Sequence, residues 1–323
     1  MPELPEVEVV RAGLEPAVTN ATVSSVAVFD ERSLRRHQGP GEDFIERLTG
    51  ATFLAPARRG KFLWLPLLAP LVDPLVDPKT MELLPPAAVF APKAPDLSES
   101  PSFSEALVVH LGMSGQVLLR EPGVEDRLTR IQIDLEHPEH GAMRLNFVDQ
   151  RIFGSMAIDE MVSTTDANQL IPSQVAHIAR DPMDQLFDDA LFLKRLAARK
   201  TGIKRALLDQ TLISGIGNIY ADEALWAARV HYGQPTNTLS RARAKTLLAE
   251  VRLVLGKALA EGGTSFDTQY LNVNGESGYF AHSLNAYGQQ GRPCPRCGRL
   301  LVRDTFMNRG SHFCRFCQRL RLR

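Results

Sequence analysis

Residues 294–297 read Cys-Pro-Arg-Cys and residues 314–317 read Cys-Arg-Phe-Cys, and these two motifs hold all four cysteines of the 323-residue chain. Each pair can supply two thiolates from one tight turn, and the 16 residues between the pairs can form a hairpin that closes a tetrahedral site. With every position around the metal filled by protein, none is left for water. The spacing predicts one structural Zn²⁺, bound by Cys294, Cys297, Cys314 and Cys317.

Two other arrangements of these cysteines fit the sequence less well. Two disulfides would need an oxidising compartment, yet Glu3, Glu6 and Glu8 stand where a secretory signal carries basic residues. A redox Cys-x-x-Cys motif would not occur twice in one terminal hairpin. We therefore favour the metal site.

Basic residues concentrate in and before this hairpin, although the whole chain is neutral with 37 basic and 37 acidic residues. Residues 292–323 contain nine arginines against Asp304 alone, and residues 192–205 contain six basic residues and no acidic one. Such segments are typical of polyanion-binding surfaces, and solvated surface charge is the alternative. For residues 292–323 we favour polyanion binding, because nearly every charge is an arginine.

The segments before the hairpin predict an α+β multidomain protein. A short helix at Leu4–Leu14, with Gly13 near its end, precedes strand-like stretches at 22–29, 51–55, 61–65, 106–111, 116–120, 130–135 and 143–148. Four helical segments follow at 183–198, 204–212, 218–229 and 240–261. We expect a β-sandwich domain at 1–160, a helical domain at 161–285 and a zinc-finger β-hairpin at 286–323.

A proline-rich stretch interrupts the strand-like region. Nine prolines lie between Pro66 and Pro101. Proline cannot donate a hydrogen bond to a sheet, so residues 66–105 are predicted to form an excursion between two strands. Prolines also interrupt the most apolar run, Phe62–Val72, which is too short to cross a membrane. We expect a soluble, cytoplasmic monomer with no membrane partner.

The N-terminus, Met1-Pro-Glu-Leu-Pro-Glu, suggests a nucleophile. Removal of Met1 would leave the secondary amine of Pro2 free. With a pKa of about 7.7–8.0, an appreciable fraction of such an amine is neutral and nucleophilic in the cell. It could attack C1′ of a nucleoside, expel the base and form an iminium that promotes strand-breaking elimination. Taken alone, Met-Pro is simply a common start.

Three further motifs follow in order: His-Leu-Gly-Met-Ser-Gly at 110–115, Asp-Gln-Arg-Ile-Phe-Gly at 149–154 and Ile-Ser-Gly-Ile-Gly-Asn-Ile-Tyr at 213–220. With the N-terminus and the cysteine hairpin, this ordered set resembles the formamidopyrimidine-DNA glycosylase family along essentially the whole chain. The resemblance implies a bifunctional DNA glycosylase and AP lyase of base excision repair, in which residues 161–285 form a helix–two-turn–helix DNA-binding domain. Its partner would be double-stranded DNA that contains oxidised purines or abasic sites, cut by β,δ-elimination, in the cytoplasm at the nucleoid.

The resemblance also implies catalytic roles for individual residues. Pro2 matches the nucleophile, and Glu3 matches the adjacent carboxylate that acts as general acid and base. Lys61 matches a lysine that contacts phosphate and assists proton transfer, and Arg309 matches the arginine that grips the phosphates beside the lesion. Taken alone, Lys61 would be a solvated charge at a strand edge. Glu6 either fixes the N-terminus or is an acidic residue favoured by the helix dipole.

A second group of residues is implied in DNA contact. Met113, Arg151 and Phe153 resemble the wedge that fills the space left by an extruded nucleotide and offsets part of the lost stacking. The other members resemble residues that contact the DNA backbone. The complete group is His110, Met113, Arg151, Phe153, Lys200 and Asn218.

Structural interpretations stay open for several of these residues. His110, Met113 and Phe153 could be core residues, and Asn218 could be an N-cap of the helix that it opens. Ile152 replaces a second arginine that the family often has before the phenylalanine, so one basic contact is missing. Glu276 and Ser277 stand in the lesion-recognition segment, at 272–280, where the family sometimes has a basic residue.

Two other functions remain as alternatives. An endonuclease VIII-type enzyme has the same fold, start and chemistry but prefers oxidised pyrimidines, and Leu4 in place of a glycine favours the purine enzyme. A DNA-binding protein without catalysis would have the excursion block the lesion channel. Pro2, Glu3 and Lys61 argue against it, because a binder needs no free proline.

Overall fold

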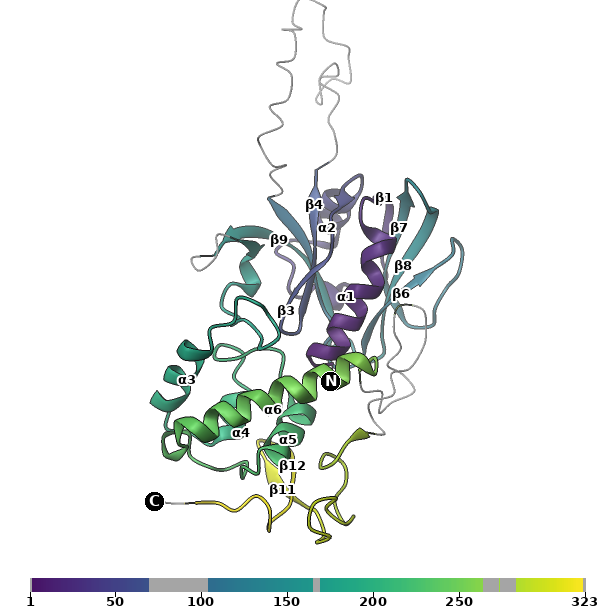
Figure 1. Ribbon diagram of the computed structural model, residues 1–323. Coiled ribbons are helices and arrows are strands. Elements are labelled where there is room, and N and C mark those ends of the chain that lie inside the picture. The colour runs from purple at the N-terminus through teal and green to yellow at the C-terminus, as the bar shows by residue number, and fades with distance from the viewer. Residues whose placement is uncertain (1, 70–103, 165–168, 264–272, 274–282, 322–323) are drawn as a thin grey trace, which may run out of the picture.

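The computed structural model describes residues 2–69, 104–164, 169–263, 273 and 283–321 (Figure 1). Within these ranges the fold is α+β, as the sequence predicts, and no helix is long and apolar enough to cross a membrane. After a first helix, most of the strands come early in the chain, most of the helices follow, and a small hairpin lies near the C-terminus.

The described strands of the first part form one antiparallel sheet in the order β10-β9-β5-β4-β2-β1-β7-β8-β6, with β3 paired to β4. Buried residues from both halves, such as Leu63 of β4 and Phe147 of β8, share one core, so the sheet closes over a common interior. The strands are β1 (Thr22–Val28), β2 (Thr52–Phe53), β3 (Ala57–Arg59), β4 (Phe62–Leu68), β5 (Glu105–His110), β6 (Gly115–Arg120), β7 (Thr129–His137), β8 (Gly141–Asp149), β9 (Ser155–Ser163) and β10 (Leu170–Pro172).

Helix α1 (Leu4–Val18) lies across this sheet (Figure 1) and buries Val7, Val10, Leu14 and Val18 at helical spacing in the sheet's core. The expected end near Gly13 is wrong, because the helix continues to Val18. Gly13 has a packing role instead. A Cβ at this position would overlap the side chain of Val273, which is buried against the helix.

The limits of the proline-rich excursion also need correction. Pro66 lies within β4, opposite Ala106 of β5, and its carbonyl accepts a hydrogen bond from Leu54 at 2.9 Å. A proline is tolerated there because the ladder uses its carbonyl. The strands therefore reach Leu68 and resume at Glu105. Most of the remaining excursion, residues 70–103, lies outside the described residues.

The helical part has its own core, which joins α5 and α6 and also takes in Leu4 from α1. The four expected helical segments are present but shorter than predicted, and α2 and the short helices were not expected. The remaining helices are α2 (Gly41–Leu48), α3 (Asp189–Ala198), α4 (Ile203–Leu207), α5 (Asn218–Ala227), α6 (Arg241–Ala260), η1 (Glu31–Leu34), η3 (Ser173–Val175) and η4 (Thr236–Thr238).

The last element is the predicted hairpin, formed by β11 (Val302–Phe306) and β12 (Arg309–Phe313) between the two cysteine pairs. Its turn residues Met307 and Asn308 both have positive φ, at 46° and 60°. Successive positive φ values suit the right-handed twist of a two-residue hairpin turn. Arg309 is the first residue after this turn.

Candidate active site

The carboxylate of Glu3 occupies the N-terminus of α5. It accepts hydrogen bonds from the backbone N–H groups of Gly217 at 2.6 Å and Ile219 at 3.0 Å, and the Tyr220 N–H lies 3.4 Å away. The first N–H groups of a helix lack partners within the helix and carry partial positive charge, so they suit an anion. The anion held at this helix is Glu3 itself. Asn218 is the first helical residue and Gly217 is the N-cap, so the interpretation of Asn218 as an N-cap is wrong.

Glu6 fixes the same end of the chain. Its carboxylate accepts a hydrogen bond from the Glu3 backbone N–H at 2.7 Å and from the Tyr220 hydroxyl at 2.5 Å, and both glutamates are buried. Burial raises the pKa of Glu3, although the nearby Lys61 ammonium opposes the rise. A Glu3 carboxyl with a raised pKa can hold a proton nearer to neutral pH and release it to a reacting group.

Lys61 lies in the tight turn between β3 and β4. Gly60 has a φ of 59°, and a Cβ there would overlap Ser214, so this turn packs directly on the loop before α5. Burial lowers the pKa of the Lys61 ammonium, whereas Glu3 and Glu6 oppose that change. Among the described residues, none forms a hydrogen bond or ion pair with the Lys61 ammonium.

Three of the predicted residues meet in one cavity. Lys61, His110 and Asn218, from three separate segments, line a space of about 290 Å³ together with Phe62 and Gln210. Burial, with the nearby Arg36 and Arg35, lowers the pKa of His110 to about 4. His110 is therefore neutral near pH 7. Its Nδ1 accepts a hydrogen bond from the Gly112 N–H at 3.2 Å, which leaves the proton on Nε2.

The expected wedge residues come from two loops in direct contact. Met113 lies between β5 and β6, and Arg151 and Phe153 lie between β8 and β9. A Cβ at Gly112, where φ is 62°, would overlap the backbone of Phe153, so only glycine allows this approach. Phe153 is 46% exposed and Arg151 is exposed. The interpretation of Phe153 as a core residue is therefore wrong.

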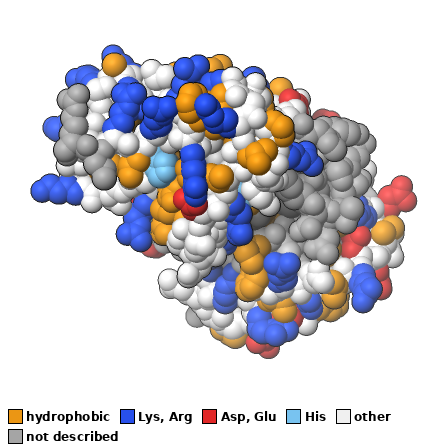
Figure 2. All heavy atoms as spheres, turned by 90° about the horizontal axis from the view of Figure 1, so that it is seen from below, with side chains coloured by type: hydrophobic (Ala, Val, Ile, Leu, Met, Phe, Trp, Pro, Cys, Tyr) orange, Lys and Arg blue, Asp and Glu red, His pale blue; other side chains and the backbone are white. Residues whose placement is uncertain are grey.

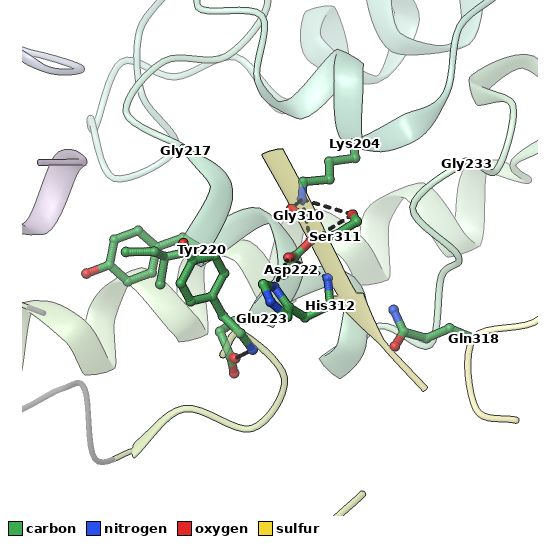
Figure 3. A network of polar contacts seen from close by, with 12 residues as sticks. Lys204, Gly217, Tyr220, Asp222, Glu223, Gly233, Gly310, Ser311, His312 and Gln318 are labelled. Carbon is green, nitrogen blue, oxygen red and sulfur yellow. Dashed lines mark hydrogen bonds and ion pairs between the residues drawn. The ribbon is translucent and has the colours of Figure 1, made fainter. Parts of the chain in front are cut away.

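Arg309 reaches the wedge from the hairpin. One of its guanidinium nitrogens, Nη2, lies 3.8 Å from the sulfur of Met113, and its charge contributes to lowering the pKa of Lys61. A buried network holds this strand in place (Figure 3). The Lys204 ammonium pairs with Asp222 of α5 at 2.7 Å and donates to the Gly310 carbonyl, and Asp222 accepts from the His312 N–H at 2.8 Å.

Helix α5 thus contacts three parts of the candidate site. Its N-terminus holds Glu3, Asp222 holds β12, and Glu223 accepts hydrogen bonds from the backbone N–H groups of residues 285–287. Burial raises the pKa of Glu223, against the effect of those hydrogen bonds. These roles of Asp222 and Glu223 could not be predicted from the sequence, because β12 and residues 285–287 lie 62 or more residues farther along the chain.

The four cysteines fit a tetrahedral metal site. Their sulfur atoms all lie within 4.8 Å of one another, with Cys297 and Cys314 at 3.5 Å. Sulfurs bound to one zinc ion at about 2.3 Å would lie about 3.8 Å apart. Burial opposes ionisation of Cys294, but hydrogen bonds from the Trp226 indole and from backbone N–H groups lower its pKa to about 7. Such donors orient and stabilise a thiolate that binds metal.

Not all basic residues of the two segments are available to a polyanion. Lys204 is completely buried, so counting it as surface charge is wrong. Arg199 pairs with Asp209, and Arg296 lies over the Trp226 ring at 4.1 Å. Lys200 is exposed just after α3 and is not among the residues that line the cavity.

Lys and Arg side chains nevertheless gather on the face of the molecule seen in Figure 2, with hydrophobic side chains between them. Acidic side chains are scattered in this view, mostly toward its margins. Charges of one sign interleaved with apolar groups suit a surface that binds a polyanion. Met1 and the segment that holds Glu276 and Ser277 lie outside the described residues.

Comparison with known proteins identifies the family. Family models for the formamidopyrimidine-DNA glycosylase N-terminal domain and H2TH domain match residues 1–156 and 178–270. A formamidopyrimidine-DNA glycosylase of Leifsonia xyli subsp. xyli is 58% identical over 99% of this chain and 100% of its own length. The chain belongs to the formamidopyrimidine-DNA glycosylase family. Another member, from Streptomyces avermitilis, is 47% identical and is covered over 98% of its length.

Solved structures of this family agree with the fold. A Lactococcus lactis Fpg in complex with DNA that contains an abasic site is 26% identical, with a TM-score of 0.74 over 98% of this chain and 99% of that one. The same protein bound to DNA with N7-benzyl-Fapy-dG has a TM-score of 0.75, and a complex with DNA that contains an oxidised pyrimidine has 0.74.

Proposed function

We propose that the protein is a bifunctional DNA glycosylase and AP lyase of base excision repair that removes oxidised purines from double-stranded DNA. The observation that carries the proposal is the position of Glu3, whose buried carboxylate is held next to Pro2 by the N-terminus of α5. Membership of the glycosylase family supports it. So does the likeness to Fpg bound to DNA with abasic sites.

Pro2 supplies the nucleophile once Met1 is removed. Its amine attacks C1′ of the lesion nucleotide, the C1′–N bond breaks, and the base leaves with the proton that the attacking nitrogen gives up. Glu3 delivers a proton to the opening deoxyribose ring, since burial raises its pKa and so favours proton uptake and release by this carboxyl. The resulting iminium acidifies the 2′ protons, and elimination of the 3′ and then the 5′ phosphate cuts the strand.

Cations around the cavity bind the DNA backbone. Lys61 offers positive charge near Glu3, Arg309 adds charge near Lys61, and neutral His110 offers an N–H donor to a phosphate oxygen. Asn218 contributes its side-chain amide to the same cavity. Lys200, exposed beyond α3, contacts the backbone farther from the lesion. Met113, Arg151 and Phe153 enter the duplex where the lesion leaves it.

The four cysteines hold one zinc ion in this proposal. The metal supplies structure and no chemistry: it closes the hairpin that carries Arg309. We also propose that the protein acts as a monomer in the cytoplasm, on nucleoid DNA, since its relatives are bacterial DNA glycosylases, whose substrate lies there.

Borohydride trapping tests the proposal. The protein is incubated with duplexes that contain 8-oxoguanine, an oxidised pyrimidine or an abasic site, and covalent adducts are counted. Trapping on 8-oxoguanine and on the abasic site, strongly reduced in Pro2→Gly, supports the mechanism. Preference for the pyrimidine would indicate endonuclease VIII-type specificity. Binding to all three duplexes without any adduct would indicate a DNA-binding protein without catalysis.

A further inference from the structure

The loop that carries Arg151 and Phe153 contains a strained residue. Ile152 has a φ of 55°, in the left-handed region, although its side chain is branched at Cβ. Branched residues are rare there because the side chain crowds the backbone, so the surrounding structure must hold the conformation in place. Glycine or asparagine adopts this backbone far more easily.

One arginine from a distant segment holds this loop by its carbonyls. Arg35 follows η1, more than 115 residues earlier in the chain. Its guanidinium donates to the carbonyls of Ile152 at 3.0 Å and Gly154 at 2.7 Å, and also to that of Phe153. Three consecutive carbonyls can point at one guanidinium only in an unusual backbone conformation, and the left-handed φ of Ile152 supplies it.

The N–H groups of the same loop are bound from the other side. The buried carboxylate of Asp149 accepts from Gly154 at 2.6 Å and from Arg151 at 3.1 Å, and also from the Ser114 hydroxyl at 2.5 Å. Asp149 belongs to the motif at 149–154, whereas Arg35 belongs to none of the motifs that identify the family. The loop is thus fixed by one anion at its N–H groups and one cation at its carbonyls.

We propose that Arg35 is a positioning residue for the wedge: it holds Ile152 in the left-handed conformation and so directs Arg151 and Phe153 toward the DNA. This inference rests on the proposed function, because it takes lesion-containing DNA to be what the wedge enters. The guanidinium of Arg35 donates its hydrogen bonds to the loop carbonyls and touches no reacting atom. The competing explanation is that its positive charge simply attracts the DNA backbone.

Three variants separate the two explanations. Arg35→Ala removes the hydrogen bonds and the charge, Arg35→Lys keeps the charge but cannot reach three carbonyls, and Ile152→Asn in the Arg35→Ala protein relieves the strain without restoring charge. Arg32→Ala is the matched control, since Arg32 is exposed nearby and pairs with Asp30. Melting temperatures show whether each variant folds.

The first readout needs no DNA. Hydrogen exchange at residues 151–154 should become about tenfold faster in Arg35→Ala, as expected when charge-assisted hydrogen bonds are lost. The exchange rate should stay unchanged in Arg32→Ala.

The second readout compares single-turnover excision of 8-oxoguanine with cleavage at a preformed abasic site. Excision should fall about tenfold, and abasic cleavage should fall less, because no stacked base has to be extruded.

Recovery of the excision rate in the double variant shows whether the backbone at Ile152 or the charge of Arg35 causes the defect. Ile152→Asn should restore part of the excision rate to Arg35→Ala, and Arg35→Lys should stay impaired. The inference is overturned if Arg35→Lys equals wild type, if Ile152→Asn restores nothing, or if loop exchange in Arg35→Ala matches the Arg32→Ala control. Should the wild-type protein cleave neither substrate, the proposed function fails, while the exchange data still decide whether Arg35 holds this loop.

Discussion

Gly217 lies against the carboxylate of Glu3 so closely that a Cβ on Gly217 would overlap it. The N–H of Gly217 donates to the same carboxylate at 2.6 Å. The backbone of this glycine has negative φ, so the requirement for glycine comes from space and not from backbone conformation. A residue in the loop before α5 thereby determines where the candidate catalytic acid lies.

We predict that Gly217→Ala displaces Glu3 and lowers base excision at least tenfold, with a smaller effect on DNA affinity. The reason is that a general acid held about 1 Å from its place loses much of its effect. Single-turnover rates and binding constants on 8-oxoguanine duplexes measure the two quantities. Gly256→Ala, inside α6 with no atom near its Cβ position, is the control and should be neutral or slightly stabilising. Equal rates for Gly217→Ala and Gly256→Ala would contradict the assignment.

The pH dependence of folding stability should show the titration of the His110 imidazole. Its pKa is lowered from 6.5 to about 4, so the unfolded chain takes up this proton first as pH falls. The contribution of neutral His110 to the free energy of unfolding is therefore complete above about pH 6.5 and is lost as pH falls toward 4. The loss amounts to about 2 kcal/mol between pH 7 and pH 5. Urea unfolding at the two pH values measures it. His110→Gln should lose less stability over this range, and an identical loss would show that His110 does not titrate as described.

Removal of the proposed zinc ion should release the hairpin and leave the sheet folded. The chain has two tryptophans, and Trp226 donates to the sulfur of Cys294, whereas Trp64 lies in the sheet. In a Trp64→Phe variant, a chelator should change Trp226 emission and weaken DNA binding together. Cys297→Ser should show both changes without chelator. Protein that contains no zinc, yet binds DNA fully, would exclude this role for the metal.

Local patterns were predictable from the sequence, and long-range partners were not. The cysteine hairpin forms from neighbouring residues, so spacing alone indicates it. Lys204 belongs to a basic run that suggests surface charge, yet the fold buries it against Asp222, because charge patterns carry no information on burial. The helix that opens at Asn218 was predicted, but not that Glu3, 214 residues away from Gly217, occupies its N-terminus.

The wedge shows the same limit. Arg151, Met113 and Phe153 stand in motifs, whereas the Arg35 contacts join segments that no spacing rule connects. Ile152 departs from the family pattern, and the sequence indicates only that a basic side chain is missing. The structure adds that the backbone at this position is left-handed, a property that side-chain identity does not reveal for isoleucine.

The last prediction concerns the base opposite the lesion and rests on Arg151. The backbone N–H of Arg151 donates a hydrogen bond to Asp149. Among the described residues, none pairs with its exposed guanidinium. A guanidinium offers only donors. Unpaired cytosine presents adjacent acceptors at O2 and N3, whereas adenine presents an acceptor at N1 beside a donor at N6. One good bidentate match discriminates by about 1–3 kcal/mol, or roughly 5- to 150-fold.

We therefore predict much faster excision of 8-oxoguanine opposite cytosine than opposite adenine, measured as single-turnover rates. This direction suits repair, because excision opposite a misincorporated adenine would fix a mutation. Arg151→Ala should remove most of the difference by slowing the cytosine duplex, and Arg32→Ala should preserve it. Equal wild-type rates on the two duplexes would show that Arg151 does not read the opposite base. A difference that survives in Arg151→Ala would assign the discrimination to another part of the wedge.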